Sequence, residues 1–191
     1  MYNEPSFSDS PAVQGFAPDE VIAHTSLRSG LVAPSQTSPL WGGMAVTLSL
    51  PGPGVPLSLG PMLSLATASS NIAAFTSFTE SDAMSRSIQN TVPQARAGDG
   101  TNPGGAINFL LLRSGARLWV KIHNDAVSAL DGGSITPTVY WDYANQQLST
   151  RAAIANDSPI SVTLLRLEEH ALVITRRGCW ADSGCAALIQ I

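Results

Sequence analysis

Histidine is the residue type best suited to acid–base and metal chemistry near neutral pH, and this chain contains three of them. His24, His123 and His170 lie far apart in the sequence, and none has a second histidine, a cysteine or a carboxylate at the spacing of metal ligands. Glu169 and the adjacent His170 could act as an acid–base pair, but neighbouring residues on a strand point to opposite faces. Glu168–His170 is therefore predicted to be a solvated turn between two strands.

Glycine and serine also fail to form a pattern that binds phosphate or supplies a nucleophile. Gly98–Gly100 and Gly104–Gly105 precede a strand, whereas phosphate-binding glycines follow a strand and open a helix. Ser114–Gly115 is predicted to lie in a turn, since no GxSxG motif surrounds it. Asp131–Ser134 lacks the alternating acidic ligands of a calcium loop. We therefore expect no catalytic residue, no metal and no cofactor.

The two cysteines, Cys179 and Cys185, flank a short stretch of five residues. A hairpin turn at Asp182–Gly184 would bring them face to face on neighbouring strands. In a reducing compartment, however, they are expected to be free thiols that act as small apolar residues. A structural zinc site would need two further ligands nearby, and the sequence offers none.

Tryptophan is the last residue type with an evident binding role. Trp41, Trp119, Trp141 and Trp180 could form a platform for a sugar or a peptide, or they could fill the core of a small β protein. We expect Trp119 and Trp141 in the core, because they lie in the most strongly patterned strands. Trp41 follows a proline-rich N-terminal stretch and is the candidate interface anchor.

Charge is sparse along the whole chain. Hydrophobic residues make up 44% of the 191 residues, which suffices for a core, whereas charged residues make up only 13%. That charged fraction is about half the average for globular proteins. Because a monomer in solution normally keeps a more charged surface, this composition predicts that much of the surface lies against other protein.

The charge balance and the chain's hydropathy argue against nucleic acid and membrane as partners. The net charge is −4, and Arg176–Arg177 is the only adjacent basic pair, so no basic stripe is available to contact phosphates. Met1–Pro5 lacks the basic start and apolar run of a signal peptide. The long charge-free stretch Ser29–Thr79 is broken by proline and glycine before it reaches ~18 consecutive apolar residues. We expect a protein made and kept in a cytoplasm.

The elements that must position any site are predicted to be mainly strands, in three regions. Residues 1–40 contain several prolines and are expected to form an extended N-terminal arm without a central strand. Residues 41–104 are expected to be a β-rich region, with a half-buried strand at Met44–Leu50 and a long polar loop at Glu80–Gly105. Residues 105–191 are expected to form a C-terminal β-barrel-like domain.

The second half has the clearer strand pattern. Ile107–Leu112 and Leu118–Ile122 are predicted to pair as a hairpin around a turn that contains Gly115. The remaining expected elements are a second hairpin from Thr138–Asp142 and Gln147–Thr150, strands at Ile160–Leu167, Ala171–Thr175 and Ala186–Ile191, and a short helical turn at Asp125–Leu130. The predicted fold class is thus mainly β, a small β-barrel or sandwich with an extended N-terminal arm.

Three segments of the second half resemble the structural cement (head decoration) proteins of tailed phages. Ser114–Lys121 is similar to a strand of that family that follows a loop, Pro137–Gln147 to a strand and its following turn, and Ala181–Ile191 to the final strand. Ser38–Gly43 also resembles phage structural proteins of this size. The resemblance implies a β-barrel-like protein that adds to the outer surface of a head shell, commonly as trimers.

The expected function is therefore that of a virion structural protein, with the major capsid protein and further copies of itself as partners. It would stabilise contacts between capsid subunits, because an extended arm can reach across a seam and add strands to exposed sheet edges. One alternative is another virion component, such as a tail-tube, head-completion or fibre-base protein. A different class is a carbohydrate-binding β module that uses exposed tryptophan.

Overall fold

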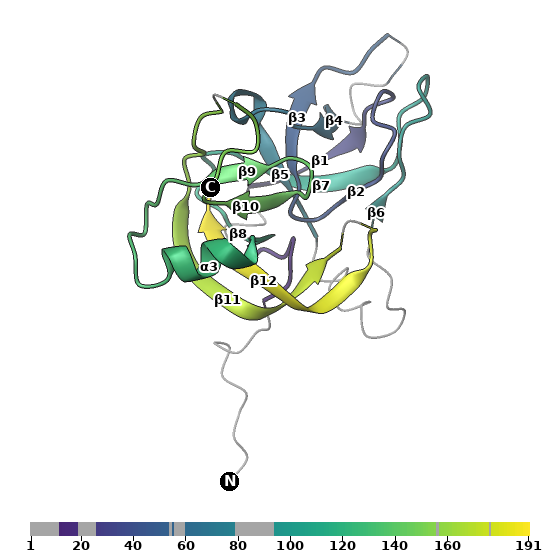
Figure 1. Ribbon diagram of the computed structural model, residues 1–191. Helices are drawn as coiled ribbons and strands as arrows, with labels where there is room; N and C mark the ends of the chain where they lie inside the picture. The colour runs from purple at the N-terminus through teal and green to yellow at the C-terminus, as the bar shows by residue number, and fades with distance from the viewer. Residues whose placement is uncertain are drawn as a thin grey trace.

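The computed structural model describes residues 12–18, 26–53, 55, 60–78, 94–155, 157–175 and 177–191, without the side chains of Asp182 and Ser183. The chain is mainly β, as predicted, and five of its strands close into a barrel in the order β1-β4-β3-β5-β7 (Figure 1). The barrel strands are β1 (Leu27–Val32), β3 (Ala45–Ser49), β4 (Met62–Leu65), β5 (Ala74–Ser77) and β7 (Ala106–Leu111). All neighbours pair antiparallel except β1 and β4, which are parallel.

A second sheet lies beside the barrel and contains the longest strands. Its order is β11-β12-β8, and β11 and β12 sweep around the lower side of the molecule in Figure 1. These strands are β8 (Arg117–Lys121), β11 (Thr163–Ile174) and β12 (Trp180–Gln190). The smaller elements are β2 (Leu40–Trp41), η3 (Ser69–Asn71), β6 (Gln94–Ala95), α3 (Asn124–Leu130), β9 (Tyr140–Asp142) and β10 (Gln147–Ser149).

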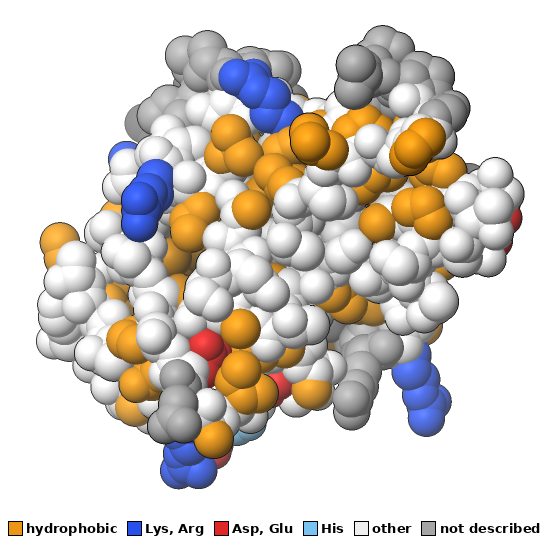
Figure 2. Space-filling model, turned by 90° about the horizontal axis from the view of Figure 1, so that it is seen from above, with side chains coloured by type: hydrophobic (Ala, Val, Ile, Leu, Met, Phe, Trp, Pro, Cys, Tyr) orange, Lys and Arg blue, Asp and Glu red, His pale blue; other side chains and the backbone are white. Residues whose placement is uncertain are grey.

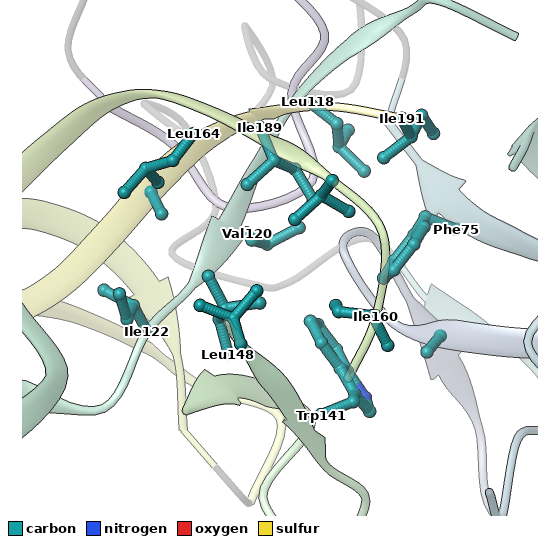
Figure 3. Packing of buried hydrophobic residues seen from close by; sticks show 14 of the residues in the cluster. Phe75, Leu118, Val120, Ile122, Trp141, Leu148, Ile160, Leu164, Ile189 and Ile191 are labelled. Carbon is teal, nitrogen blue, oxygen red and sulfur yellow. The ribbon is translucent and has the colours of Figure 1, made fainter. Parts of the chain in front are cut away.

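One hydrophobic core joins the barrel to the second sheet and to the β9–β10 hairpin. Figure 3 shows side chains from β5, β8, β10 and β12 pointing toward one another. Trp141 is 0% exposed in this core, and Trp119 is 4% exposed in a separate buried cluster with Ala12 and Val173, which confirms the prediction that both are buried core residues. The rings of Trp141 and Phe75 meet edge to face, with centroids 5.2 Å apart. Because this core includes residues from both sides of position 104, the expected boundary at 104/105 does not separate two cores.

The barrel lies in a different part of the chain from the one predicted. Its strands come from residues 27–111, whereas residues 117–190 form the second sheet and the β9–β10 hairpin. The expectation that residues 1–40 hold no central strand is wrong, because β1 pairs with both β4 and β7. Gly30 makes this possible, since a side chain there would clash with Leu63 and with the carbonyl of Pro61.

Part of the predicted arm is also built into the interior. Residues 12–18 run between the second sheet and the barrel, where Gln14 is fully buried. The side chain of Gln14 accepts a hydrogen bond from the backbone of Ile174 at 2.8 Å and donates one to the carbonyl of Gly42 at 3.2 Å. These contacts overturn the expectation that the whole stretch before Trp41 lies outside the fold. Residues 1–11 and 19–25 lie outside the described residues.

The predicted hairpin between Ile107–Leu112 and Leu118–Ile122 does not form, although both strands do. β7 pairs with β1 and β5 inside the barrel, whereas β8 pairs with β12. The turn between them has left-handed backbone at Arg113 and Gly115, and the amide of Gly115 donates to the carbonyl of Ile191. The chain therefore leaves the barrel at this turn and enters the second sheet.

The predicted turn at Glu168–His170 is wrong as well. These residues lie within β11, which runs without a break from Thr163 to Ile174 and absorbs register shifts against β12. The chain reverses instead at residues 175–179, where the amide of Thr175 donates to the carbonyl of Cys179 at 2.8 Å. Asp182–Gly184 is strand, so the conditional hairpin there does not form. The predictions of the helical turn and of the second hairpin are confirmed by α3 and by the antiparallel β9–β10 pair.

Candidate interaction surface

Trp41, the candidate interface anchor, lies half-buried on the short strand β2. Its indole packs against two clusters, one inside the barrel and one around Phe78 and Ile174. Its carbonyl accepts a hydrogen bond from Thr76 Oγ1 at 2.6 Å, so its backbone is held by the barrel strand β5. The residue is therefore fixed in place while part of its ring remains accessible.

A cavity of about 380 Å³ opens beside Trp41, between the β9–β10 turn and the 175–179 turn. Its volume is within the range of small-molecule and side-chain pockets. The lining is mostly apolar and amide in character, and Arg177 is the one charged residue among its described lining residues. The remaining lining residues are Ser38, Pro39, Met44, Leu65, Gln94, Tyr143, Ala144, Asn145, Gln146, Ile174 and Thr175.

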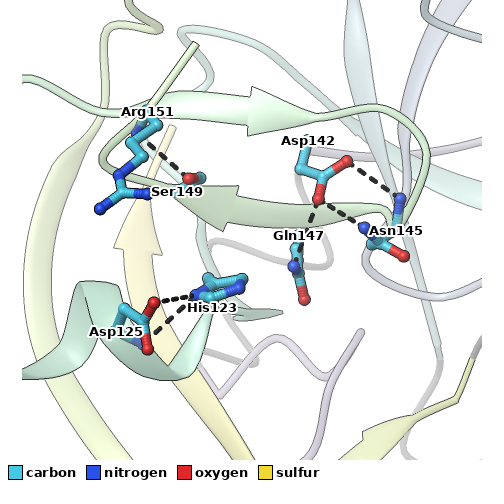
Figure 4. A network of polar contacts seen from close by, with 7 residues as sticks. All are labelled: His123, Asp125, Asp142, Asn145, Gln147, Ser149 and Arg151. Atoms are coloured by element: carbon cyan, nitrogen blue, oxygen red, sulfur yellow. Dashed lines mark hydrogen bonds and ion pairs between the residues drawn. The ribbon is translucent and has the colours of Figure 1, made fainter. Parts of the chain in front are cut away.

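The wall from the β9–β10 turn is held by Asp142. Its carboxylate accepts hydrogen bonds from the backbone amides of Ala144 and Asn145, both at 3.1 Å, and from Asn145 Nδ2 at 2.7 Å (Figure 4). Burial alone would raise the pKa of Asp142, but these bonds and one from Gln147 outweigh it and lower the pKa. The carboxylate is thus ionised and directed into its own turn.

Gln146 connects the same turn to the core through hydrogen bonds of its side chain. Its backbone is left-handed, with φ of 49°. Its side-chain oxygen accepts hydrogen bonds from the amide of Ala45 at 3.1 Å and from Trp141 Nε1 at 3.2 Å, and its Nε2 donates to the carbonyl of Tyr143 at 2.9 Å. A buried amide with this many partners strongly restrains the backbone around it. The side of the cavity formed by residues 143–146 is therefore rigid.

The opposite wall is the 175–179 turn, which carries Arg177. The amide of Gly178 donates to the carbonyl of Thr175 at 2.9 Å, and Gly178 has a φ of 73°, where glycine is favoured. A methyl group at Gly178 would lie 3.7 Å from Cζ3 of Trp41, so this turn is in van der Waals range of the indole. The fold thus brings Arg177 beside Trp41, although the two are remote in sequence.

A polar contact connects the β9–β10 turn to the neighbouring loops. The hydroxyl of Tyr143 donates to Asp157 Oδ2 at 2.7 Å, and Ser69 donates to Asp157 Oδ1 from its hydroxyl at 2.7 Å and from its amide at 3.0 Å. Burial would raise the pKa of Asp157, but the hydrogen bonds from Ser69 and Tyr143 prevail and lower it. Burial, together with the hydrogen bond to Asp157, raises the pKa of Tyr143 above its ordinary range.

We predict that Asp157 makes stability depend on pH in the acid range. Because its folded pKa is lowered, its contribution is complete above the ordinary aspartate pKa of ~3.9 and is lost as pH falls below that value. Asp157→Asn should therefore lower the free energy of unfolding at pH 7, and this difference from wild type should shrink below about pH 4. Urea titrations over that pH range measure the effect, with Asp131→Asn at an exposed turn as the control. A difference independent of pH would contradict the assignment.

The other residues singled out in the sequence are not brought together. His123 caps the start of α3, where its Nδ1 accepts a hydrogen bond from the amide of Asp125 at 3.2 Å, and His170 lies exposed on β11. Cys179 is exposed, Cys185 is buried, and both are free thiols. Among the described residues, no group of three or more His, Cys, Asp and Glu is placed to hold a metal ion.

Sequence reasoning identified Trp41 but not its cavity. Arg177 was noticeable only as half of the one adjacent basic pair, and no local pattern predicts that a turn between β11 and β12 lies against β2. No helix in the described part of the chain is long and apolar enough to cross a membrane. Comparison with protein-family models, with curated protein sequences and with solved structures found no match.

Proposed function

We propose that the chain is a virion structural protein that binds the outer surface of a phage capsid and stabilises contacts between major capsid subunits. The observation that carries the proposal is an apolar and weakly charged surface. On the end of the molecule seen in Figure 2, charged side chains are few and hydrophobic side chains lie exposed in several places. Over the described part of the chain as a whole, the exposed large hydrophobic residues are Leu50, Leu111, Ile135, Ile154 and Leu165.

The extent of this exposure favours burial against protein. Leu50 is 88% exposed and Ile135 is 66% exposed, so burying either would contribute on the order of 1–2 kcal/mol by removing apolar area from water. Single exposed hydrophobic residues are common on soluble proteins. Several of them on a chain with only 13% charged residues favour association with another protein, because few charges are present to oppose it.

The outer edge of β11 offers a second kind of contact. On the side away from β12, the amide of Leu164 donates to the carbonyl of Ile135, and Leu172 exchanges backbone hydrogen bonds with Ala12 and Gln14. From Leu165 to Ala171, no backbone hydrogen bond joins that side to the described part of the chain. A groove of about 280 Å³ opens along residues 164–167, with the exposed side chains of Ile135 and Leu165 at its border. An open strand edge with apolar neighbours can accept a strand from another chain.

We predict that the protein forms a homo-oligomer, a trimer as the resemblance to decoration proteins implies, and that Leu165 contributes to the contact. Leu165→Glu should shift the purified protein toward monomer, because it places a charge in the apolar border of the β11 groove. Light scattering across a concentration series measures the effect, and Thr101→Glu, which adds the same charge at an exposed bend, is the control. A wild-type protein that stays monomeric at every concentration would contradict the prediction.

The experiment that tests the proposed function is the heat stability of particles with and without the protein. A protein–protein contact of standard size buries ~1,600 Å², and shell symmetry repeats each contact many times. Particles that carry the protein should therefore lose their genome at a higher temperature than particles without it, and adding purified protein back should restore the difference. Equal heat stability, with the protein bound or absent, would contradict a stabilising role.

A further inference from the structure

The cavity beside Trp41 has a charge opposite to that of the chain as a whole. The net charge of the protein is −4, yet the one charged residue among the described lining residues is Arg177. The carboxylate of the β9–β10 turn, Asp142, is occupied by hydrogen bonds within its own turn and is not among the described lining residues. No ion pair between Arg177 and a described acidic residue is present.

The rest of the lining complements a side chain and a stretch of backbone. Trp41, Met44 and Ile174 supply apolar surface, whereas Gln94 and Asn145 supply amide groups that can donate to or accept from a peptide backbone. Tryptophan and arginine are the residues that most often dominate the binding free energy of protein interfaces. A guanidinium also matches a carboxylate with two parallel hydrogen bonds, which an ammonium cannot do.

We infer that this cavity binds an acidic segment of a partner protein, with a carboxylate held by Arg177 and an adjacent apolar side chain against Trp41. The inference rests on the proposed function only in that the ligand is part of a protein surface. The volume of about 380 Å³ admits one or two side chains but no folded element. The cavity therefore binds a short extended segment. The positive charge of Arg177 favours acidic segments over neutral or basic segments.

The rigidity of the β9–β10 wall supports this role, because that turn is fixed by Asp142 and Gln146. On the opposite side, Thr175 is held by backbone hydrogen bonds with Gly178 and Cys179. A site that is already formed before binding loses little conformational entropy when a ligand enters. Trp41 and the β9–β10 turn are thus in place before a segment approaches.

An array of capped extended peptides tests the inference on the full-length protein. Each probe carries one aspartate or glutamate between apolar residues, and its matched partner carries asparagine or glutamine at the same position. Fluorescence anisotropy should show tighter binding of the acidic members. Arg177→Glu should lower their affinity by about tenfold or more, because it removes a charge-assisted hydrogen bond and adds repulsion. Trp41→Leu should weaken acidic and neutral members alike, provided that its melting temperature stays near that of wild type.

Arg151→Glu is the matched control, since it makes the same charge change at the other end of the β9–β10 hairpin from Asn145 (Figure 4). Its peptide affinities should equal those of wild type. Equal binding of the acidic and amide peptides, no binding of any acidic peptide, or an Arg177→Glu variant that binds like wild type would each overturn the inference. Peptide selectivity with no effect of the protein on particle stability would instead contradict the proposed function alone.

Discussion

Trp141→Ala should lower the free energy of unfolding by about 3–5 kcal/mol, since large-to-small substitutions of fully buried aromatic residues cost this much. Trp141 is 0% exposed, and its ring packs edge to face on Phe75 with centroids 5.2 Å apart. Its Nε1 also donates to Gln146 Oε1 at 3.2 Å, so the substitution removes a partner from the amide that fastens the β9–β10 turn. Chemical denaturation of the purified variant measures the loss.

Trp141→Phe provides the graded comparison. Phenylalanine keeps most of the apolar contact with Phe75 but cannot donate to Gln146, whose oxygen would still accept from the amide of Ala45. The loss should therefore be smaller than for alanine, about 1–3 kcal/mol. An alanine variant as stable as wild type would show that the core shared by β5 and the β9–β10 hairpin does not hold the fold together.

Gly15→Ala should destabilise the protein by about 2–5 kcal/mol, which combines a left-handed backbone cost with overpacking. Gly15 has a φ of 82°, and a methyl group there would lie 2.5 Å from Cα of Gly42. The backbone cannot easily shift to relieve the clash with Gly42, because Gly15 is hydrogen-bonded on both sides. Its amide donates to the carbonyl of Trp119 at 2.7 Å, and its carbonyl accepts from the amide of Phe78 at 2.7 Å.

Gly100→Ala separates the two causes. Gly100 also has a positive φ, of 90°, but nothing lies within 4 Å of the added methyl group. This control should cost only the backbone term, about 1–2 kcal/mol. If Gly15→Ala cost no more than Gly100→Ala in thermal or urea unfolding, residues 12–18 would not be packed between the barrel and the second sheet as described.

Local patterns predicted where strands occur better than how they pair. The alternation at Met44–Leu50 and the turn residues after Thr138–Asp142 identified β3 and the β9–β10 hairpin, because side-chain period and turn chemistry are local properties. The partners of β7 and β8 could not be read in the same way. Each pairs with strands remote in sequence, and the short turn between them favoured a hairpin that does not form.

Proline led to a wrong prediction for part of the N-terminal stretch. The prolines suggested an arm throughout residues 1–40, but two glycines of this stretch lie in close contacts inside the fold. Gly30 leaves room for Leu63, and Gly15 leaves room for Gly42. Trp41 was recognised from its residue type, whereas the cavity beside it depends on the tertiary placement of Arg177 and the β9–β10 turn.

A cryo-EM reconstruction of the intact virion tests the central claim most directly. We predict density with this barrel and its long β11–β12 sheet on the outer surface of the head, at junctions between major capsid subunits, in the many copies that shell symmetry imposes. Contact between the capsid and the surface around Trp41 is the expected arrangement. Density for this fold in the tail or at a connector, in far fewer copies, or its absence from the particle, would contradict the account.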